Sequence, residues 1–301
     1  MSRIAAGSAA GFLALGARRE APAADPGLYI VSTPIGNLAD ITLRALEVLA
    51  GVDLILAEDT RHSRRLLDHY GIATPLSAYH EHNAERARPE ALARLEQGQA
   101  LALISDAGTP LVSDPGFKLV AQARRSGFDV HPVPGASALM AALVAAGLPT
   151  DRFLFEGFLP PKAEARRARL NALAGIEATL VFYEAPQRLG ECLADLAAEL
   201  GPRPACVARE LTKLHETLHS GPLDALAAHY AEAEARGEIV IVVGAPPARQ
   251  AIEPAALREE LEALLVAHTT KDAAAILAAR HGLPRRDLYA QALALLRRRG
   301  T

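Results

Sequence analysis

The sequence predicts an α/β protein made of two α/β/α sandwich domains followed by a small C-terminal helical segment. Strand-like and helix-like runs alternate from residue 28 to residue 245, a pattern typical of a mainly parallel sheet covered by helices. A length of 301 residues fits two domains and a smaller part, at about 100–200 residues per domain. Beyond a Pro- and Ala-rich stretch at 245–254, only helices are expected.

The first half is predicted to hold strands separated by amphipathic helices. Each helical segment closes in a glycine, as helix C-termini often do, and the apolar run DLILA indicates a strand buried on both faces. Asp40 and Asp114 precede helical segments and are expected to cap them. The expected strands are 28–34, 52–59, 75–79, 100–107 and 129–134, and the expected helices are 42–51, 60–71, 84–98 and 116–127.

The second half begins with a helical segment and continues with a second sheet. The short sequence LTK resembles a hairpin connection between two strands, so this sheet is expected to be mixed. The expected strands are 153–160, 178–186, 205–212, 215–221 and 238–245, and the expected helices are 137–149, 163–174, 187–200 and 222–236.

These segments divide the chain into four parts. The Ala- and Gly-rich start predicts a disordered tail over residues 1–27. An N-terminal α/β domain over 28–137 and a C-terminal α/β domain over 138–245 follow. The extension at 246–301 is predicted to be helical, and the turn GLP gives its last two helices the spacing of a helix-turn-helix, although a plain helical hairpin has the same pattern.

The bulk composition bears on several classes of protein. The formal net charge of -3 does not by itself indicate a nucleic-acid binder, since these usually carry a basic excess, but basic clusters at 61–65, 162–169 and 295–299 leave an acidic partner open. No apolar run approaches the ~20 residues of a membrane span, and the core GFLALG is too short for a signal peptide. Cys192 and Cys206 do not suggest a disulfide framework. A cytoplasmic protein with no membrane segment is therefore expected.

Four Gly- and Pro-rich loops follow the carboxyl ends of predicted strands. They are STPIGNLAD (32–40), SDAGTPLVSDPG (105–116), VPGAS (133–137) and FYEAPQR (182–188). In open α/β sheets, ligands bind beyond the carboxyl ends of the strands. The loops therefore predict an active site.

The ligand of these loops is unlike a simple phosphate or a metal ion. Neither a Walker motif nor a dinucleotide fingerprint is present, and the loops at 32–40 and 105–116 carry aspartates but no Lys or Arg. Glu58 and Asp59 are adjacent, but neighbours on a strand point to opposite faces, so no metal site is predicted. A cationic ligand fits better. S-adenosylmethionine carries a sulfonium and an ammonium against one carboxylate, and glycines let the main chain approach its adenosine.

Several long motifs resemble the tetrapyrrole methylase superfamily of S-adenosylmethionine enzymes. They include YIVSTPIGNLADITLRAL (29–46), LISDAGTPLVSDPG (103–116), FYEAPQRL (182–189) and GEIVIVVG (237–244), and the resemblance extends over nearly all of 28–298. It implies two α/β domains with the cofactor in the cleft between them. Within the superfamily the motifs are similar to the branch that methylates the 2′-hydroxyl of a cytidine ribose in the decoding region of 16S rRNA.

The resemblance also implies a set of cofactor-binding residues. The first loop departs from the GxGPGDP pattern of the small-molecule enzymes, and Glu184 stands where they carry a methionine. The implied cofactor residues are Pro34, Gly36, Asp106, Gly108, Thr109, Val112, Gly135, Ser137, Tyr183 and Glu184.

Methyl transfer to a hydroxyl requires a base, and several side chains follow strands on the expected active side. Asp59, Glu58 and His80 are the candidates we select, with His82 and Asp106 as further ones. Asp59 or Thr60 could instead cap the next helix. The basic residues just beyond would suit RNA phosphates; they are Arg61, Arg64 and Arg65.

Three functions remain open from the sequence. The first is methylation of 16S rRNA, expected on the 30S particle because the chain has little positive charge to neutralise free RNA. The second is C-methylation of a tetrapyrrole precursor, which the altered first loop and the helical extension disfavour. The third is a non-catalytic adenosyl-binding regulator. A homodimer is expected from the resemblance alone.

Overall fold

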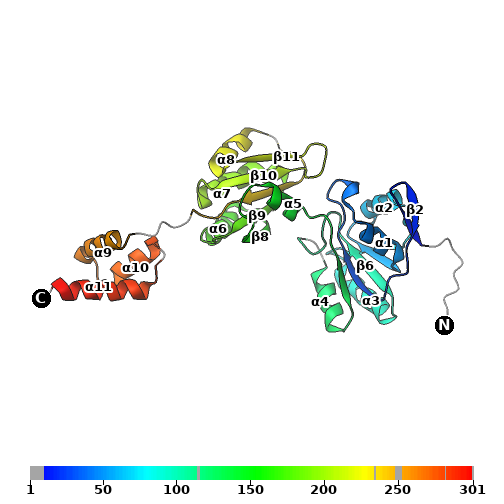
Figure 1. Ribbon diagram of the computed structural model, residues 1–301, viewed down its shortest axis with the longest axis horizontal. Helices are drawn as coiled ribbons and strands as arrows, with labels where there is room; N and C mark the ends of the chain where they lie inside the picture. The colour runs from blue at the N-terminus through cyan, green and yellow to red at the C-terminus, as the bar shows by residue number, and fades with distance from the viewer. Residues whose placement is uncertain (1–9, 114–115, 234, 248–252, 282, 300–301) are drawn as a thin grey trace. The chain divides into compact units, whose positions relative to one another are not determined.

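The computed structural model describes residues 10–113, 116–233, 235–247, 253–281 and 283–299 (Figure 1). Contacts between residues divide the chain into two compact units, Met1–Pro246 and Pro247–Thr301. The first unit holds two five-stranded sheets, and the second holds helices in its described part. The predicted class, two α/β domains with a helical extension, is confirmed.

The first sheet is wholly parallel, with the strand order β5-β4-β6-β3-β7. Its strands are short and apolar, and β6 is buried along its whole length because helices cover both faces. The strands are β3 (Gly27–Val31), β4 (Leu54–Ala57), β5 (Leu76–Ala78), β6 (Ala100–Ile104) and β7 (Val130–Val133).

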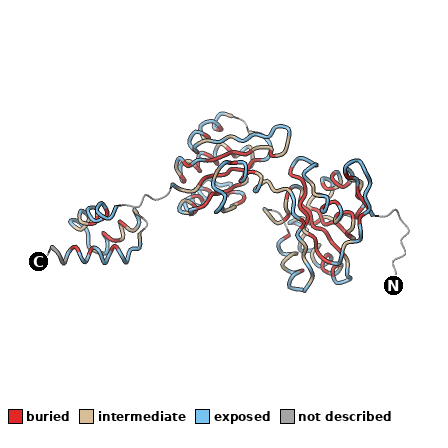
Figure 2. Tube along the Cα trace, in the orientation of Figure 1, coloured by how far each residue is buried: buried red, intermediate tan, exposed pale blue. Residues whose placement is uncertain are grey.

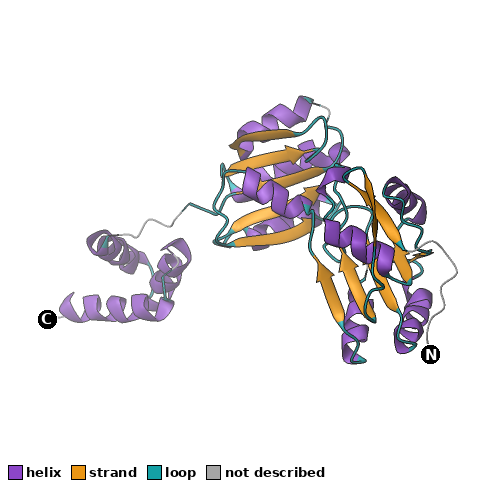
Figure 3. Ribbon diagram, turned by 45° about the vertical axis from the view of Figure 1, so that its right-hand side comes forward, coloured by secondary structure: helices purple, strands orange, loops and turns teal. Residues whose placement is uncertain are grey.

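Helices cover this sheet on two faces, as Figure 3 shows. Alternate strand residues face opposite sides: one set packs on α1 (Leu43–Gly51) and α2 (Thr60–His69). The other set packs on α3 (Ala84–Glu96) and α4 (Phe117–Arg125). Burial is accordingly concentrated in the strands and on the inner helix faces (Figure 2).

The second sheet is mixed, as predicted, with the order β11-β10-β12-β9-β8. Only β8 and β9 pair in parallel, and the other pairs are antiparallel. The strands are β8 (Phe153–Phe158), β9 (Thr179–Glu184), β10 (Pro204–Arg209), β11 (Thr217–Pro222) and β12 (Ile239–Val243). One face packs on α6 (Ala163–Leu173), α7 (Leu189–Leu200) and α8 (Leu223–Glu232), and the other packs on α5 (Ala138–Ala145).

The second unit packs three described helices around a small core of its own. They are α9 (Pro254–Ala267), α10 (Thr270–His281) and α11 (Arg285–Arg299). Small and branched side chains meet there, including Leu261, Ala273, Ala274 and Leu277, all fully buried.

Two local predictions are wrong. Residues 10–27 are not a disordered tail, because β1 (Gly11–Ala14) and β2 (Ala17–Glu20) form an antiparallel hairpin. Phe12 is buried in the core that contains α1, and the Leu13 N–H donates to the Tyr70 carbonyl over 2.7 Å. Tertiary packing therefore orders a segment whose composition alone suggested disorder. Residues 1–9 of the expected tail lie outside the described residues.

The second wrong prediction concerns helix capping. Asp40 does not cap α1: it ends a short 3-10 helix, η1 (Leu38–Asp40), and Thr42 caps α1 through a 3.1 Å hydrogen bond from the Ala45 N–H to its Oγ1. The expected cap at Asp114 lies outside the described residues.

Candidate functional site

The carboxyl ends of the parallel strands place the sequence-predicted loops in one row. Because all five strands run the same way, the segments that follow β5, β4, β6, β3 and β7 emerge at one edge of the sheet in that order. His80 follows β5, Asp59 follows β4, and Asp106 follows β6. Gly36 and Ser137 lie beyond β3 and β7.

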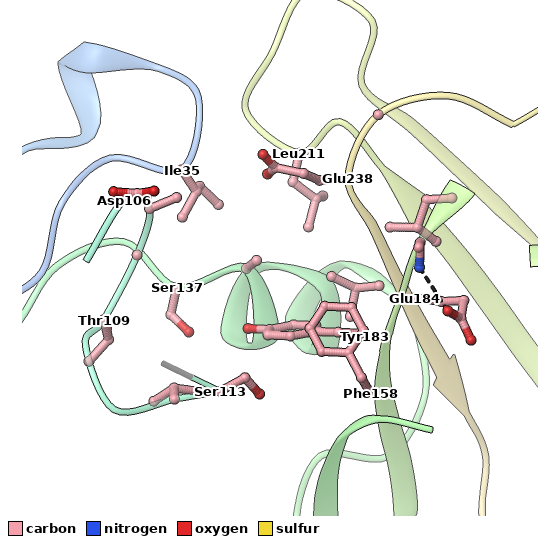
Figure 4. Close-up of a pocket in the computed structure, with 18 of the residues that line it drawn as sticks. Ile35, Asp106, Thr109, Ser113, Ser137, Phe158, Tyr183, Glu184, Leu211 and Glu238 are labelled. Carbon is pink, nitrogen blue, oxygen red and sulfur yellow. Dashed lines mark hydrogen bonds between the residues drawn. The ribbon is translucent and has the colours of Figure 1, made fainter. Parts of the chain in front are cut away.

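A cavity of about 380 Å³ lies at the β6, β3 and β7 side of this edge. Its remaining wall comes from the second sheet, at the ends of β8, β9 and β12 and from the connection between β10 and β11 (Figure 4). The volume is within the usual range for small-molecule sites. Seven of the predicted cofactor residues line it: Asp106, Gly108, Thr109, Val112, Ser137, Tyr183 and Glu184.

The loop after β6 is fastened to the loops after β3 and β7. Thr33 and Gly108 exchange two backbone hydrogen bonds, of 2.8 and 3.1 Å. The Thr109 Oγ1 donates to the Ala136 carbonyl over 3.2 Å and lies 2.9 Å from the Ser32 Oγ. These contacts hold the three loops as one wall.

Part of this wall is in the left-handed backbone region. Gly108 has a φ of +82°, and the non-glycine residues Leu111 and Ser113 have φ values of +73° and +66°. For the two non-glycine residues such conformations cost of order 1–3 kcal/mol each and persist where surrounding contacts impose them. Their location beside the cavity is typical of a functional loop.

Tyr183 and Glu184 are neighbours on β9 and therefore point to opposite faces. Tyr183 points into the cavity (Figure 4), with its ring 4.9 Å from that of Phe155 and 5.6 Å from that of Phe158. The Glu184 carboxylate points away from the cavity, accepts the Ala185 N–H over 2.8 Å and pairs with the Arg188 Nε at 3.3 Å. Of the two residues that the resemblance implied, Tyr183 is thus the one whose side chain points into the cavity.

The three other implied cofactor residues, Pro34, Gly36 and Gly135, do not line the cavity themselves. Pro34 and Gly36 flank Ile35, which does. A Cβ on Gly135 would lie 2.9 Å from the Ser32 Cβ, so a side chain there would push the loops apart. Gly36 has a φ of +150° and lies directly under the side chain of Lys213.

The charge of the cavity favours a cation. Its charged lining residues are Asp106, Glu184 and Glu238, and no Lys or Arg lines it within the described ranges. Glu184 pairs with Arg188 and Glu238 pairs with Lys213, so Asp106 contributes most of the uncompensated negative charge. Since opposite charges stabilise one another in a partly enclosed site, this lining suits the sulfonium of S-adenosylmethionine. The rest of the lining is largely apolar or small, which suits its adenosine.

The proposed catalytic acids lie beside the cavity rather than in its lining. The Asp59 N–H donates to the Asp106 Oδ1 over 3.0 Å, so Asp59 adjoins the cavity through its backbone. The Asp59 carboxylate accepts the N–H groups of Arg61 and His62 and caps α2. These backbone hydrogen bonds lower the pKa of Asp59, so the group is ionised near neutral pH.

The neighbouring candidates occupy the outer part of the same edge. Glu58 is partly exposed at the end of β4. The Nδ1 of His80 is buried without a hydrogen-bond partner, and its ring centroid lies 6.1 Å from that of His82. The expected RNA-binding arginines lie on the first turns of α2, where Arg61 and Arg65 are exposed and Arg64 is partly exposed.

Several cavity residues could not be selected from the sequence. Ile35, Phe158, Leu211, Ile239 and Val240 are apolar residues that resemble core positions until the two sheets meet. Glu238 stands at the start of a predicted strand, inside the motif GEIVIVVG, which was not connected with the cofactor. A useful signal was the position of Leu211 inside ARELTKLHE (208–216), a further motif that resembles the superfamily.

Other kinds of site are absent from the described part of the chain. No group of three His, Cys, Asp or Glu side chains is arranged to hold a metal ion. Among the described helices, none has the length and the apolar character that crossing a bilayer requires.

Comparison with known families assigns these sheets and their cavity to a class of methylating enzyme. The family model of the tetrapyrrole (corrin/porphyrin) methylases matches residues 27–227, and the chain belongs to that family. A model of the RsmI C-terminal HTH domain matches residues 251–296.

Several relatives that are about half identical to this chain are named ribosomal RNA small subunit methyltransferase I. The chain is 52% identical to that of Mesorhizobium japonicum over 273 residues, which covers 90% of this chain and 92% of the relative. It is 53% identical to that of Pseudomonas aeruginosa over 272 residues, covering 88% and 96%.

Solved structures support the fold. A uroporphyrin-III C-methyltransferase from Thermus thermophilus, in complex with S-adenosylhomocysteine, superposes with a TM-score of 0.52 at 21% identity, covering 72% of this chain and 97% of that one. A diphthine synthase superposes with a TM-score of 0.58 at 17% identity, covering 72% and 89%.

Proposed function

We propose that this chain transfers a methyl group from S-adenosylmethionine to the ribosomal RNA of the small subunit. The observation that carries the proposal is sequence identity: about half of the residues, over about nine-tenths of the chain, are identical to those of enzymes named ribosomal RNA small subunit methyltransferase I. The acid-lined cavity supplies the physical support, because it suits a cationic methyl donor.

In its finer form the proposal names the 2′-hydroxyl of a cytidine ribose in the decoding region of 16S rRNA, within the 30S particle. It also includes a cytoplasmic homodimer. These details come from the resemblance of the motifs. The formal net charge of -3 adds a reason for the particle as substrate, since binding to free RNA depends on neutralising phosphates.

We propose that donor and acceptor occupy separate places along the sheet edge. The cofactor cavity occupies the β6, β3 and β7 side, and the acids and histidines follow β4 and β5 on the other side. Asp106 lies at the junction, in the cavity lining and hydrogen-bonded to the Asp59 backbone. The target nucleotide would therefore approach over β4 and β5, where the arginines of α2 can contact its phosphates.

The chemistry is an in-line displacement. Bound S-adenosylmethionine supplies a methyl carbon activated by its sulfonium. The residues of the cavity wall align the reacting atoms, and alignment can supply about 7–11 kcal/mol. We propose that a carboxylate among Asp59, Glu58 and Asp106, or the imidazole of His80, accepts the hydroxyl proton, a role worth about 10²–10⁴-fold in rate.

The test is the transfer of label from methyl-labelled S-adenosylmethionine. The purified chain is incubated separately with 30S subunits, naked 16S rRNA and a porphyrinogen, and digested RNA is analysed for 2′-O-methylcytidine. Label on the 30S particle, in excess of that on naked rRNA, is expected. Label in the porphyrinogen alone would establish the C-methyltransferase alternative, and binding without transfer to any of the three would favour the regulator.

A further inference from the structure

A cluster of charged side chains, Lys213 with Glu210 and Glu238, adjoins the cavity at the connection between β10 and β11. None of the roles proposed above involves it. The Lys213 Nζ lies 3.0 Å from the Glu210 Oε1 and 3.3 Å from the Glu238 Oε1. The Lys213 side chain is only 26% exposed, so this pair is better shielded than the ordinary surface pairs of the chain.

Backbone hydrogen bonds tie the same residues together. The Glu210 N–H donates to the Glu238 carbonyl over 3.0 Å, and the Glu238 N–H donates to the Glu210 Oε1 over 2.9 Å. Glu210 and Thr212 have φ values of +52° and +67°. The left-handed backbone turns the connection sharply, and the Glu216 carboxylate holds that turn by accepting the Thr212 N–H over 2.6 Å.

Glu210 and Lys213 stabilise each other in their charged forms. The backbone hydrogen bond from Glu238 and the hydrogen bond from Lys213 lower the pKa of Glu210. Burial alone would lower the pKa of Lys213, but the hydrogen bond to Glu210 and the charge of Glu238 outweigh it and raise that pKa. Both groups are therefore charged around neutral pH.

The Lys213 stem reaches across to the first loop of the other sheet. A Cβ on Gly36 would lie 2.7 Å from the Lys213 Cε and closer still to its Cγ. Only a glycine leaves room for the lysine here, and the φ of +150° at Gly36 also favours glycine. A second glycine, Gly237, gives room in the same way to the Glu210 carboxylate.

The residues on both sides of this contact are cavity residues. Ile35 precedes Gly36, Leu211 follows Glu210, and Glu238 is itself a partner of Lys213; all three line the cavity. Ile35 and Leu211 also belong to one apolar cluster. A displacement of Lys213 would thus move two walls of the cavity relative to each other.

We propose that Lys213 is a positioning residue for the methyl donor. Its ammonium, held between Glu210 and Glu238, fixes its stem over Gly36 and so sets the spacing of the Ile35 and Leu211 walls. Lys213 does not line the cavity, so it acts through these walls. The inference rests on the proposed function in one respect: the ligand of the cavity is S-adenosylmethionine.

The first test measures binding of S-adenosylhomocysteine by calorimetry. Lys213→Met keeps most of the stem but removes the charge, and a rise in Kd of about tenfold is expected, which corresponds to ~1.4 kcal/mol. Lys213→Arg, which restores the charge, should bind within about threefold of wild type. Lys118→Met is the matched control, because Lys118 forms an exposed pair with Glu85 at 3.9 Å; its Kd should be unchanged.

The second test is a double-mutant cycle of Gly36→Ala and Lys213→Ala. Each single variant is expected to weaken binding about tenfold, and the double variant should be no weaker than the weaker single, because both disrupt one contact. With 30S subunits, Lys213→Met should raise the KM for S-adenosylmethionine and leave kcat at saturating cofactor within about threefold.

The outcomes separate this inference from the proposed function. Wild-type binding for Lys213→Met, failure of Lys213→Arg to recover affinity, a mainly reduced kcat, or additive losses in the cycle would each overturn the positioning role. A wild-type chain that binds S-adenosylhomocysteine but labels no RNA would overturn the proposed function alone. A wild-type chain that does not bind it would overturn both.

Discussion

Replacing Gly108 by alanine should weaken cofactor binding beyond any effect on folding. Gly108 has a φ of +82°, and a Cβ there would lie 3.3 Å from the Ile35 Cγ2, at the cavity wall. A left-handed backbone costs an L-residue about 1–2 kcal/mol. In a unit of this size that corresponds to a fall in the unfolding midpoint of about 2–4 °C per kcal/mol.

Gly127 provides a matched control for the strain. It has the same φ of +82°, but a Cβ there would meet nothing within 4 Å. Gly127→Ala should therefore lose a similar amount of stability while its Kd for S-adenosylmethionine stays within about twofold of wild type. Gly108→Ala should show the same loss of stability and in addition a Kd raised about tenfold, because the methyl group crowds Ile35.

The assay combines thermal unfolding of both variants with calorimetric titration of S-adenosylmethionine. A wild-type affinity for Gly108→Ala would refute the assignment of this wall to the cofactor. A loss of affinity in both variants would show that general destabilisation is the cause.

Three further predictions concern capping, the hairpin and pH. Asp59→Ser should keep the unfolding midpoint, since serine also caps helices, but lower kcat by about 100-fold; undiminished kcat would exclude the Asp59 carboxylate as the base. Phe12→Ala should lower the free energy of unfolding in urea by about 3–5 kcal/mol, because Phe12 is buried with α1, and a negligible change would contradict that packing. Burial alone would raise the pKa of Asp195, but hydrogen bonds from Arg167 and Arg166 outweigh it and lower that pKa. The ion pair of Asp195 with Arg166 and Arg167 therefore stabilises the fold fully above the unfolded pKa of about 3.9, and this stability is lost as pH falls through the folded pKa. Asp195→Asn should thus have a lower unfolding free energy than wild type near neutral pH, and the difference should shrink below pH ~4. A difference that does not change with pH would contradict this.

Much of the fold was predictable because its signals are local. Continuous apolar runs such as DLILA predicted buried strands, and glycines marked helix ends, so both sheets and the helices of the extension could be recognised. The N-terminal hairpin could not, because Phe12 and Ala14 acquire their partners only when β1 packs on α1. The cap of α1 could not be predicted either, because Asp40 and Thr42 are both polar residues close to the helix start. Asp40 ends a 3-10 helix in the structure, which leaves Thr42 as the cap.

Part of the candidate site was likewise predictable from the sequence, and part depended on the tertiary structure. Loops such as 105–116 could be assigned to the cavity from their place after a strand, since parallel strands end at one edge whatever their order. The sequence by itself therefore determined the class of fold, and it predicted the edge where a ligand should bind and a preference for a cation. Only the tertiary structure decided that Tyr183 faces the cavity while Glu184 pairs with Arg188, because the face that a strand presents depends on what packs against it. It also brought Leu211 and Glu238 to the cavity and laid Lys213 over Gly36, since contacts between residues so distant in sequence leave no periodic pattern in the chain.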